Sequence, residues 1–302
     1  MIIAFSILVH EKLEVVIDQI HNFKKFNPGS IIILHISEDF KNELKGSIDF
    51  FLKYNFVYIN PRSLKTGLAD NSQFLGHLSN INHLLTSNVK YDYVCFHASN
   101  DMFVRSGLCD FIIRFDVGST QFKINSDSEW EQGRNALKDK NLIRCVERMT
   151  AVSELNLFGS NIEGSYLNYD ISKKIHELCL RNNLNKNNLF VEFLRKILIK
   201  NKYLFFIFKK IFQGVLYGKE EVYFSTLSYY FSQKVSEPYV YINWKNNLTI
   251  DREDIDNILE KKWEKLNGKA NLNPIKDFEY FAVKRVNRDI NDLMRIYINE
   301  NC

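Results

Sequence analysis

No two of the five cysteines stand in a C-x-x-C spacing. They are odd in number and scattered along the chain, at Cys95, Cys109, Cys145, Cys179 and Cys302. This pattern argues against a structural zinc site and against a disulfide framework, and it suits a reducing compartment. We therefore expect a cytoplasmic protein.

Long apolar runs are also missing. The best candidate for a membrane span, residues 203–208, is cut off by Lys209 and Lys210, and it is far shorter than the roughly 20 residues that a spanning helix needs. The first residues show no basic region ahead of their apolar run and no small-residue cleavage site, so they predict a first strand instead of a signal peptide. The net charge of +4 is too small to indicate a nucleic-acid partner.

Several catalytic signatures are absent. The sequence contains no G-x-x-x-x-G-K-[ST] phosphate loop, no G-x-G-x-x-G after the first strand, no H-E-x-x-H and no G-x-S-x-G. A kinase, a dehydrogenase, a zinc protease or an α/β-hydrolase would each usually carry one of these motifs. Their absence disfavours all four classes.

What is present is a regular alternation of strand and helix in the first hundred residues. Nearly continuous apolar runs predict buried strands at 2–9, 30–36, 56–59 and from 91 onward, and helical spacing of apolar residues predicts helices at 13–21, 48–54 and 72–85. Strands that alternate with helices favour a mostly parallel, doubly wound sheet of the nucleotide-binding type. The fold class we predict is therefore α/β.

The remainder is less regular. We expect one or two strands in 111–123, polar helix and loop in 127–149, a loop entering a strand in 156–169 and a helix at 171–180. Further on, the pattern predicts an amphipathic helix at 220–231, a strand at 239–242, a helix at 252–265 and a last helix near the end.

One segment, 181–218, differs in composition from the rest. It carries eight lysine or arginine residues against Glu192 alone, and aromatic residues are interleaved with them. A basic, aromatic, helical insertion can lie on an anionic membrane surface. The alternative is a helical hairpin with a lysine-rich solvent face.

A polar tip follows the strand that starts near residue 91. Ser99-Asn100-Asp101 comes directly after an apolar run, and in open α/β sheets ligands bind beyond the carboxyl ends of the strands. Asn100 and Asp101 are therefore candidate site residues, although such a tip can also simply start a turn or cap a helix.

Six segments in a particular order resemble one family of enzymes. They are Ile7-Leu8-Val9-His10, Ile33-Leu34-His35-Ile36-Ser37, Phe74-Leu75-Gly76-His77-Leu78-Ser79, the strand and tip at 91–101, the loop at 159–166, and Glu220-Glu221-Val222-Tyr223-Phe224-Ser225-Thr226-Leu227. Together they resemble the core-2/I-branching N-acetylglucosaminyltransferase and peptide xylosyltransferase type of glycosyltransferase. Ser37 stands where that family usually has aspartate, and the tryptophan that usually precedes Gly76 is missing.

The resemblance implies a GT-A-like fold and an inverting sugar transfer from a nucleotide-sugar donor. Such a reaction needs a carboxylate that takes the proton of the attacking hydroxyl. By the match to the family's helix start, Glu221 is the candidate base and Glu220 its alternate. The competing interpretation is a first-turn glutamate that only stabilises the helix dipole.

The leaving diphosphate needs positive charge or a metal ion. Metal-dependent enzymes of this fold supply Asp-x-Asp, whereas the tip here has only Asp101, so we expect no metal cofactor. Lys284, Arg285 and Arg288 are the candidates for binding diphosphate. The competing interpretation is that these three residues only form a basic, solvent-exposed face.

Further roles are implied by the same resemblance. Asn100 and Asp101 would bind the donor, with Asp101 contacting either the donor sugar or the acceptor directly. His10 and Arg62 would line the nucleotide pocket. The acceptor would meet the loop at 159–166, which offers Glu163, Ser165 and Tyr166.

We expect a single domain over 1–302, with a nucleotide-sugar-binding half at 1–110 and an acceptor-binding and catalytic half at 111–302. The predicted partners are a nucleotide sugar, an oligosaccharide or lipid-linked glycan acceptor, and the anionic inner face of a membrane, in bacterial surface polysaccharide synthesis. Two alternatives stay open: a sulfotransferase or nucleotidyltransferase on the same sheet, and a non-catalytic carbohydrate- or nucleotide-binding protein.

Overall fold

The computed structural model describes residues 1–41, 48–51, 53–67, 70–150, 155–186, 214–244, 249–266 and 277–302. Most of the basic aromatic segment, residues 187–213, lies outside these ranges. Its predicted helices and its predicted membrane contact therefore stay predictions.

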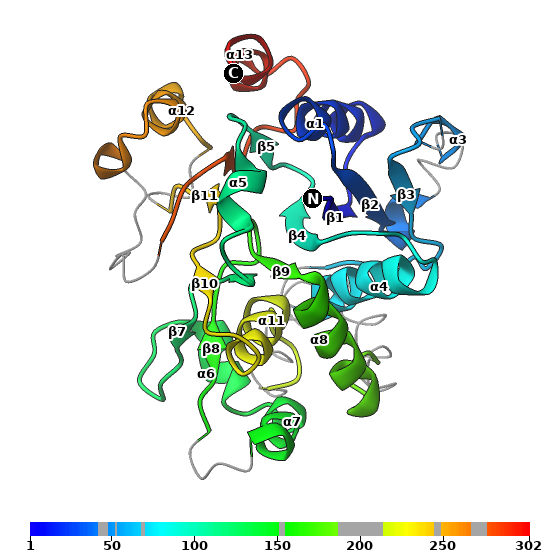
Figure 1. Cartoon of the computed structure of the whole chain (residues 1–302), viewed down its shortest axis with the longest axis vertical. Helices are drawn as coiled ribbons and strands as arrows, with labels where there is room; N and C mark the ends of the chain where they lie inside the picture. The colour runs from blue at the N-terminus through cyan, green and yellow to red at the C-terminus, as the bar shows by residue number, and fades with distance from the viewer. Residues whose placement is uncertain are drawn as a thin grey trace, which may run out of the picture.

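A seven-stranded sheet forms the centre of the molecule, in the order β10-β6-β9-β4-β1-β2-β3 (Figure 1). All neighbouring strands are parallel except the two pairs that β9 makes with β4 and β6. The strands are β1 (Ile3–Val9), β2 (Ile31–Ile36), β3 (Val57–Ile59), β4 (Tyr93–Ala98), β6 (Val117–Gly118), β9 (Tyr166–Asn168) and β10 (Val235–Ser236). The predicted α/β class with a mostly parallel sheet is thus confirmed.

Two small sheets contain the remaining strands of the described residues. The first, in the order β11-β12-β5, contains β5 (Met102–Phe103), β11 (Val240–Tyr241) and β12 (Ala282–Val283). The second pairs β7 (Phe122–Lys123) with β8 (Phe158–Gly159). Because β12 runs directly into Lys284, the first small sheet positions the basic residues of the last part of the chain.

Helices flank the main sheet on both faces (Figure 1). The described helices are α1 (Leu13–Phe26), α2 (Glu38–Lys41), α3 (Ile48–Phe51), α4 (Ser72–Thr86), α5 (Leu108–Ile112), α6 (Glu131–Ala136), α7 (Lys140–Thr150), α8 (Tyr169–Arg181), α11 (Glu220–Tyr229), α12 (Arg252–Leu259), the 3-10 helix η2 (Trp263–Lys265) and α13 (Leu293–Asn301).

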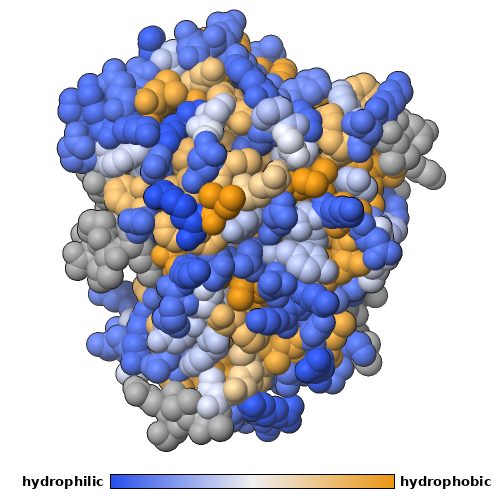
Figure 2. Space-filling model, viewed as in Figure 1, coloured by the Kyte–Doolittle hydropathy of each residue, from blue (hydrophilic) through white to orange (hydrophobic). Residues whose placement is uncertain are grey.

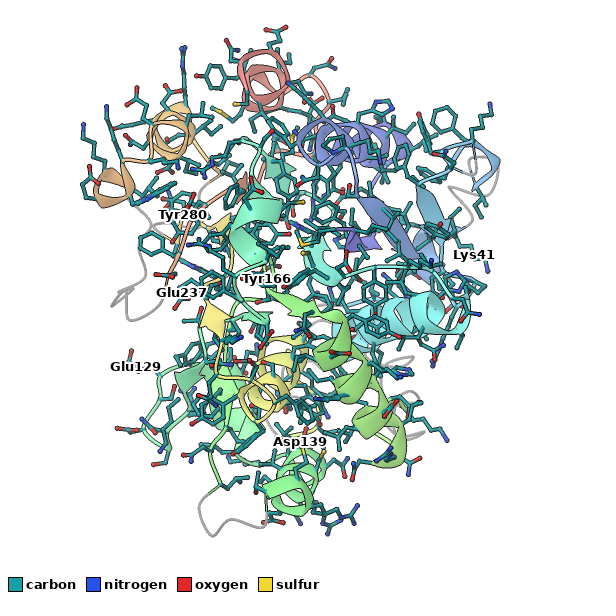
Figure 3. All side chains as sticks on the ribbon, in the orientation of Figure 1. Lys41, Glu129, Asp139, Tyr166, Glu237 and Tyr280 are labelled. Atoms are coloured by element: carbon teal, nitrogen blue, oxygen red, sulfur yellow. The ribbon has the colours of Figure 1, made fainter. Side chains whose placement is uncertain are left out.

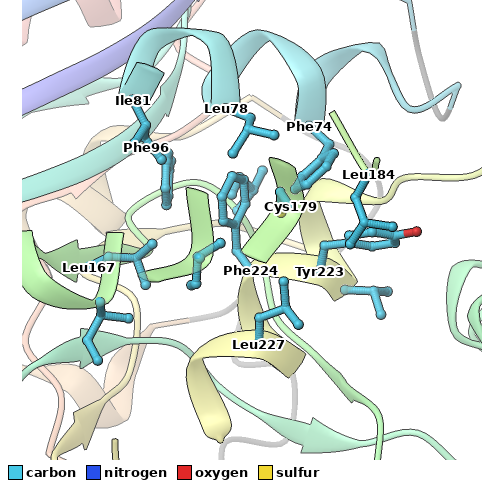
Figure 4. Close-up of a cluster of buried hydrophobic side chains, with 14 of the residues drawn as sticks. Phe74, Leu78, Ile81, Phe96, Leu167, Cys179, Leu184, Tyr223, Phe224 and Leu227 are labelled. Atoms are coloured by element: carbon cyan, nitrogen blue, oxygen red, sulfur yellow. The ribbon is translucent and has the colours of Figure 1, made fainter. Parts of the chain in front are cut away.

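The core has one layer on each face of the sheet. Alternate residues of β1 point to opposite faces: Phe5 and Ile7 pack with α1 and α5, whereas Ala4 packs with α4, α8 and α11. Figure 4 shows the second layer, in which Phe74 of α4 faces Tyr223 and Phe224 of α11. The ring centroids lie 4.8 and 5.1 Å apart, within the range of favourable aromatic pairs.

Most predicted elements are present, with three differences. The region 111–123 begins inside helix α5, and its two strands are only two residues long. Helix α12 ends at Leu259, and Lys261 takes a left-handed φ of 57° before η2. Finally, the predicted amphipathic helix at 220–231 is α11, whose residues Val222 to Ser228 are all buried.

On the face shown in Figure 2, hydrophilic and hydrophobic residues are interspersed. None of the helices among the described residues is both long enough and apolar enough to cross a membrane.

Candidate functional site

A pocket of about 310 Å³ lies beyond the carboxyl ends of β1 and β4. This is the position at which open α/β sheets bind ligands. Its walls come from seven stretches of the chain. In chain order they are Leu8 and His10; Gln73 and His77; His97, Ala98 and Asn100; Gln132; Ile162 and Glu163; Gly218, Glu220 and Glu221; and Lys284, Arg285 and Arg288.

The two glutamates Glu220 and Glu221 begin α11 and line the pocket. Gly218 precedes them, and a Cβ placed on it would stand 3.3 Å from Glu220 Oε1 and 3.4 Å from Glu221 Oε2. The glycine therefore leaves both carboxyl groups the space they occupy. Its backbone N–H donates to Gln132 Oε1 at 2.9 Å, which fixes the approach to the helix.

Both carboxyl groups hold protons more tightly than usual. Burial, followed by the charge of Glu221, raises the pKa of Glu220 to about 8. Burial, together with the charge of Glu163, raises the pKa of Glu221 to about 7, and the charge of Lys284 opposes this rise. A carboxylate with a pKa near neutrality is suited to accept a proton in one step and release it in the next.

A buried cluster around Asp139 holds the start of α11 in place. Its Oδ2 accepts hydrogen bonds from Tyr217 at 3.0 Å and Tyr223 at 2.7 Å and lies 2.8 Å from Lys219 Nζ. Burial alone would raise the pKa of Asp139, but the charge of Lys219 and these hydrogen bonds outweigh burial and lower it. In Figure 3 the residue lies between α11 and α7.

Opposite the glutamates, Lys284 forms an ion pair with Glu163. The two side chains are 21% and 10% exposed, so the pair is largely withdrawn from water. The sequence assigned Lys284 to the donor and Glu163 to the acceptor, and the structure brings them into direct contact.

The other predicted cations also reach the pocket. Arg288 Nε lies 2.7 Å from the buried Glu11 Oε1, which accepts a further hydrogen bond from Ser99 at 3.2 Å. Arg285 donates to the carbonyl of Asn243 at 3.2 Å. Burial and the two nearby cations Arg288 and Lys284 lower the pKa of His10 to about 4, so its imidazole is neutral at pH 7.

Asp101 does not line the pocket, whereas its neighbour Asn100 does. The Asp101 side chain is fully buried, and its Oδ2 lies 2.9 Å from His97 Nδ1 and accepts the Ala98 N–H at 3.0 Å. His97 Nε2 in turn shares a 2.6 Å hydrogen bond with the Tyr239 hydroxyl. The carboxylate thus closes the turn after β4 and orients a histidine that does line the pocket.

Three further candidates also lie away from the pocket walls. Tyr166 is fully buried in β9, at the centre of Figure 3, and its hydroxyl lies 2.6 Å from Ser236 Oγ. Ser165 donates to the carbonyl of Asn161 at 2.5 Å. Arg62 is exposed on the segment after β3.

Sequence reasoning missed four polar residues of the pocket: Gln73, His77, His97 and Gln132. His77 stands within a motif that carried the resemblance, and the helix containing it was predicted. In an open α/β sheet the start of that helix lies at the same edge as the carboxyl ends of the strands, where the Asn100 tip also lies. That convergence was the signal that could have identified Gln73 and His77, whereas no local signal marks Gln132.

No family model matches the chain. The chain is 25% identical over 186 residues to the chondroitin synthase of Pasteurella multocida strain Pm70, an alignment covering 57% of this chain and 18% of that protein. It is also 25% identical over 189 residues to the Pasteurella multocida hyaluronan synthase, covering 58% of this chain and 18% of the relative. The chain thus spans less than a fifth of these relatives. They support the broad expectation of a glycosyltransferase and not the branching family in particular.

Two solved structures are similar over 99% of the chain at low scores. An active-site mutant of LgtC gives a TM-score of 0.42 at 9% identity, with 94% of that chain covered. The apo form of the glycosyltransferase GlyE from Streptococcus pneumoniae TIGR4 gives 0.34 at 11% identity, with 59% covered.

Proposed function

We propose that this chain is a GT-A-like glycosyltransferase domain that moves a sugar from a nucleotide-sugar donor to a carbohydrate acceptor with inversion. The observation that carries the proposal is the composition of the pocket. One wall presents the partly protonated carboxyl groups of Glu220 and Glu221, and another presents Lys284, Arg285 and Arg288. The similarity to chondroitin and hyaluronan synthases supports the same class.

In this proposal Glu221 is the general base. Its carboxylate removes the proton of the acceptor hydroxyl while the hydroxyl oxygen forms a bond to the anomeric carbon. The bond between that carbon and the diphosphate oxygen breaks on the opposite face, and its electron pair leaves with the diphosphate. Glu221 suits the role better than Glu220. Glu220 is more deeply buried and has the higher pKa, so a smaller fraction of it is ionised and free to accept a proton at neutral pH. A positioned base typically contributes about 10² to 10⁴ in rate.

The three cations would stabilise the charge that develops on the diphosphate. An arginine offers a planar fork and a lysine a flexible point charge, and both suit phosphate oxygens. His10 and Asn100 would line the donor site beside them. Within the described part of the chain, no three His, Cys, Asp or Glu side chains are grouped to hold a metal ion. We propose that the transfer needs no metal ion.

The acceptor would approach from the side of Glu163, whose carboxylate can accept hydrogen bonds from sugar hydroxyls. We propose an oligosaccharide or lipid-linked glycan acceptor in bacterial surface polysaccharide synthesis, assembled at the inner membrane face. We place the assembly at the membrane because the segment 181–218 carries an excess of positive charge, which an anionic membrane surface would attract.

Thermal unfolding with a panel of nucleoside diphosphates and nucleotide sugars, each with EDTA and with Mn²⁺, tests the proposal. A ligand at a hundredfold excess over its Kd stabilises the folded state by about 2.7 kcal/mol. We expect one nucleotide to raise the melting temperature in EDTA. A shift that needs Mn²⁺ would contradict metal independence, and the absence of any shift would contradict a nucleotide-sugar enzyme.

A further inference from the structure

The ion pair between Lys284 and Glu163 joins two groups that the proposed function uses for different substrates. Lys284 is the donor-side cation and Glu163 the acceptor-side carboxylate, yet each is the other's partner in the pocket. Breaking a largely buried pair leaves both charges uncompensated unless a ligand replaces the lost partner. A diphosphate could replace Glu163 beside Lys284, and sugar hydroxyls could replace Lys284 beside Glu163.

The backbone on the Glu163 side is fixed. The following residue, Gly164, has a φ of 76°, and its N–H donates to the carbonyl of Phe96 at 2.9 Å. A Cβ on Gly164 would stand 2.4 Å from the backbone nitrogen of Val240, so the loop is pressed against the small sheet. Glu163 can therefore exchange partners only by rotating its side chain.

The backbone on the Lys284 side is fixed as well. The Lys284 N–H donates to the carbonyl of Tyr241 at 3.0 Å, and the Val286 N–H donates to the carbonyl of Asn100 at 3.2 Å. Arg285 between them has a left-handed φ of 70°. The lysine side chain has four flexible carbons, which let its ammonium group move within the pocket without a backbone change.

Resting on the proposed function, we propose that Glu163 is a displaceable counter-ion of Lys284. The donor diphosphate takes Lys284 from Glu163, and the freed carboxylate then binds the acceptor hydroxyls. The donor binds first, because until then the acceptor-side carboxylate is occupied. Glu163 is thus an acceptor-binding residue that also weakens nucleotide binding and couples the two substrate sites.

The variant Glu163→Gln tests this exchange, with UDP, GDP and CDP as probes in calorimetric titration. Removing a competitor raises apparent affinity by the reciprocal of the fraction of lysine that was free. We expect the nucleotide that binds wild type to bind Glu163→Gln about tenfold more tightly. Glu163→Asp, which keeps the charge but shortens the reach, should tighten binding by a smaller factor and serves if the glutamine variant does not fold.

The matched control is Glu279→Gln. Glu279 also pairs with a partly buried cation, Arg105, but it does not line this pocket. Its loss should leave nucleotide affinity unchanged, which separates partner exchange from a general gain of positive charge. In turnover assays Glu163→Gln should lower KM for the donor and raise KM for the acceptor.

Unchanged or weaker nucleotide binding by Glu163→Gln, with normal binding by wild type, would overturn the exchange and leave the proposed function intact. Equal tightening in Glu279→Gln would overturn it too, since the effect would then be one of net charge. Failure of wild type and of both Glu163 variants to bind any of the nucleotides would overturn the proposed function itself.

Discussion

At the scale of single residues, the adjacent carboxyl groups Glu220 and Glu221 have different surroundings. Glu220 is 5% exposed, and its Oε2 has no hydrogen-bond partner among the described residues. Glu221 faces the pocket, where Lys284 partly offsets the effect of burial on its pKa. At neutral pH Glu220 is therefore mainly protonated, whereas a substantial fraction of Glu221 is ionised and able to act as a base.

The raised pKa of Glu220 makes the folded state sensitive to alkali. Its folded pKa of about 8 lies above the ordinary value of 4.5. The folded state therefore holds this proton more tightly, and the stability it contributes is fully present below 4.5 and lost as pH rises through 8. Glu220→Gln keeps the neutral shape and cannot ionise. Between about pH 5 and about pH 9 we expect it to lose roughly 4 kcal/mol less stability than wild type.

Urea unfolding at a series of pH values measures this difference. An identical pH dependence in wild type and Glu220→Gln would contradict the assignment of a buried, protonated Glu220.

The tip after β4 shows what residue patterns can and cannot predict. The position of a polar tip at a strand end was predictable, and Asn100 does line the pocket. The sequence could not tell that the turn folds Asp101 back beneath it, where the carboxylate meets His97 and the Ala98 N–H. That choice depends on a buried histidine and on Tyr239, which lies far along the chain.

At the scale of elements, α11 is the helix that carries the candidate base. Its sequence reads as amphipathic, but it contacts β8, α4, α6 and α8 and is buried nearly all round. Thr226 Oγ1 accepts the Phe158 N–H at 2.9 Å and donates to the Phe158 carbonyl at 3.0 Å, so polar side chains of the helix find buried partners. Periodicity alone cannot reveal this, since a serine or threonine that pairs inside the protein reads like one facing water.

The cluster at the start of α11 predicts a large loss of stability for Asp139→Asn. The amide keeps the hydrogen bond from the Asn141 N–H to Oδ1 at 3.0 Å but leaves Lys219 buried without a counter-charge. Removing one partner of a buried pair costs about 3 to 5 kcal/mol. We expect a loss of about 3 kcal/mol in urea unfolding, together with weaker nucleotide binding, because α11 is no longer held in place.

The matched control is Asp39→Asn, which breaks the surface pair with Lys65, whose side chains are 50% and 36% exposed. Such exposed pairs contribute at most about 1 kcal/mol. Equal losses in the two variants would show that the Asp139 cluster does not anchor the helix.

At the scale of the whole molecule, the pocket exists only when distant parts of the chain meet. Its walls draw on residues from Leu8 to Arg288. The parallel strands and helices of the first hundred residues were predictable, because each shows its own apolar period. The strands predicted at the end of 156–169 and at 239–242 correspond to β9 and β11, but the antiparallel pairing of β9 with β4 and β6 was not predictable. Strand β12, which delivers Lys284, was not predicted either, because a strand of two residues has no period to detect.

Gly164 is the point at which the small sheet meets the main one. Its N–H donates to the Phe96 carbonyl at 2.9 Å and its carbonyl accepts the Tyr239 N–H at 3.2 Å. Its φ of 76° and the 2.4 Å approach to Val240 N leave no room for a Cβ. Gly164→Ala should therefore destabilise the fold by about 2 kcal/mol or more in urea unfolding.

Gly29→Ala is the control for that substitution, since the nearest atom to its Cβ would be the Met1 carbonyl oxygen at 3.9 Å. We expect it to change stability by no more than about 0.5 kcal/mol. If Gly164→Ala changed stability as little as Gly29→Ala, the packing of the two sheets would not depend on the close contact at Gly164.

If Glu221 removes the acceptor proton in a sugar transfer, as we propose, replacing its carboxylate must slow the transfer and spare donor binding. The most direct measurement is the rate of donor consumption at saturating nucleotide sugar by wild type and by Glu221→Gln, with donor affinity measured in parallel. We expect the variant to bind the donor within about threefold of wild type and to turn it over at least about 100-fold more slowly. Turnover at the wild-type rate by a folded Glu221→Gln would contradict this role of Glu221.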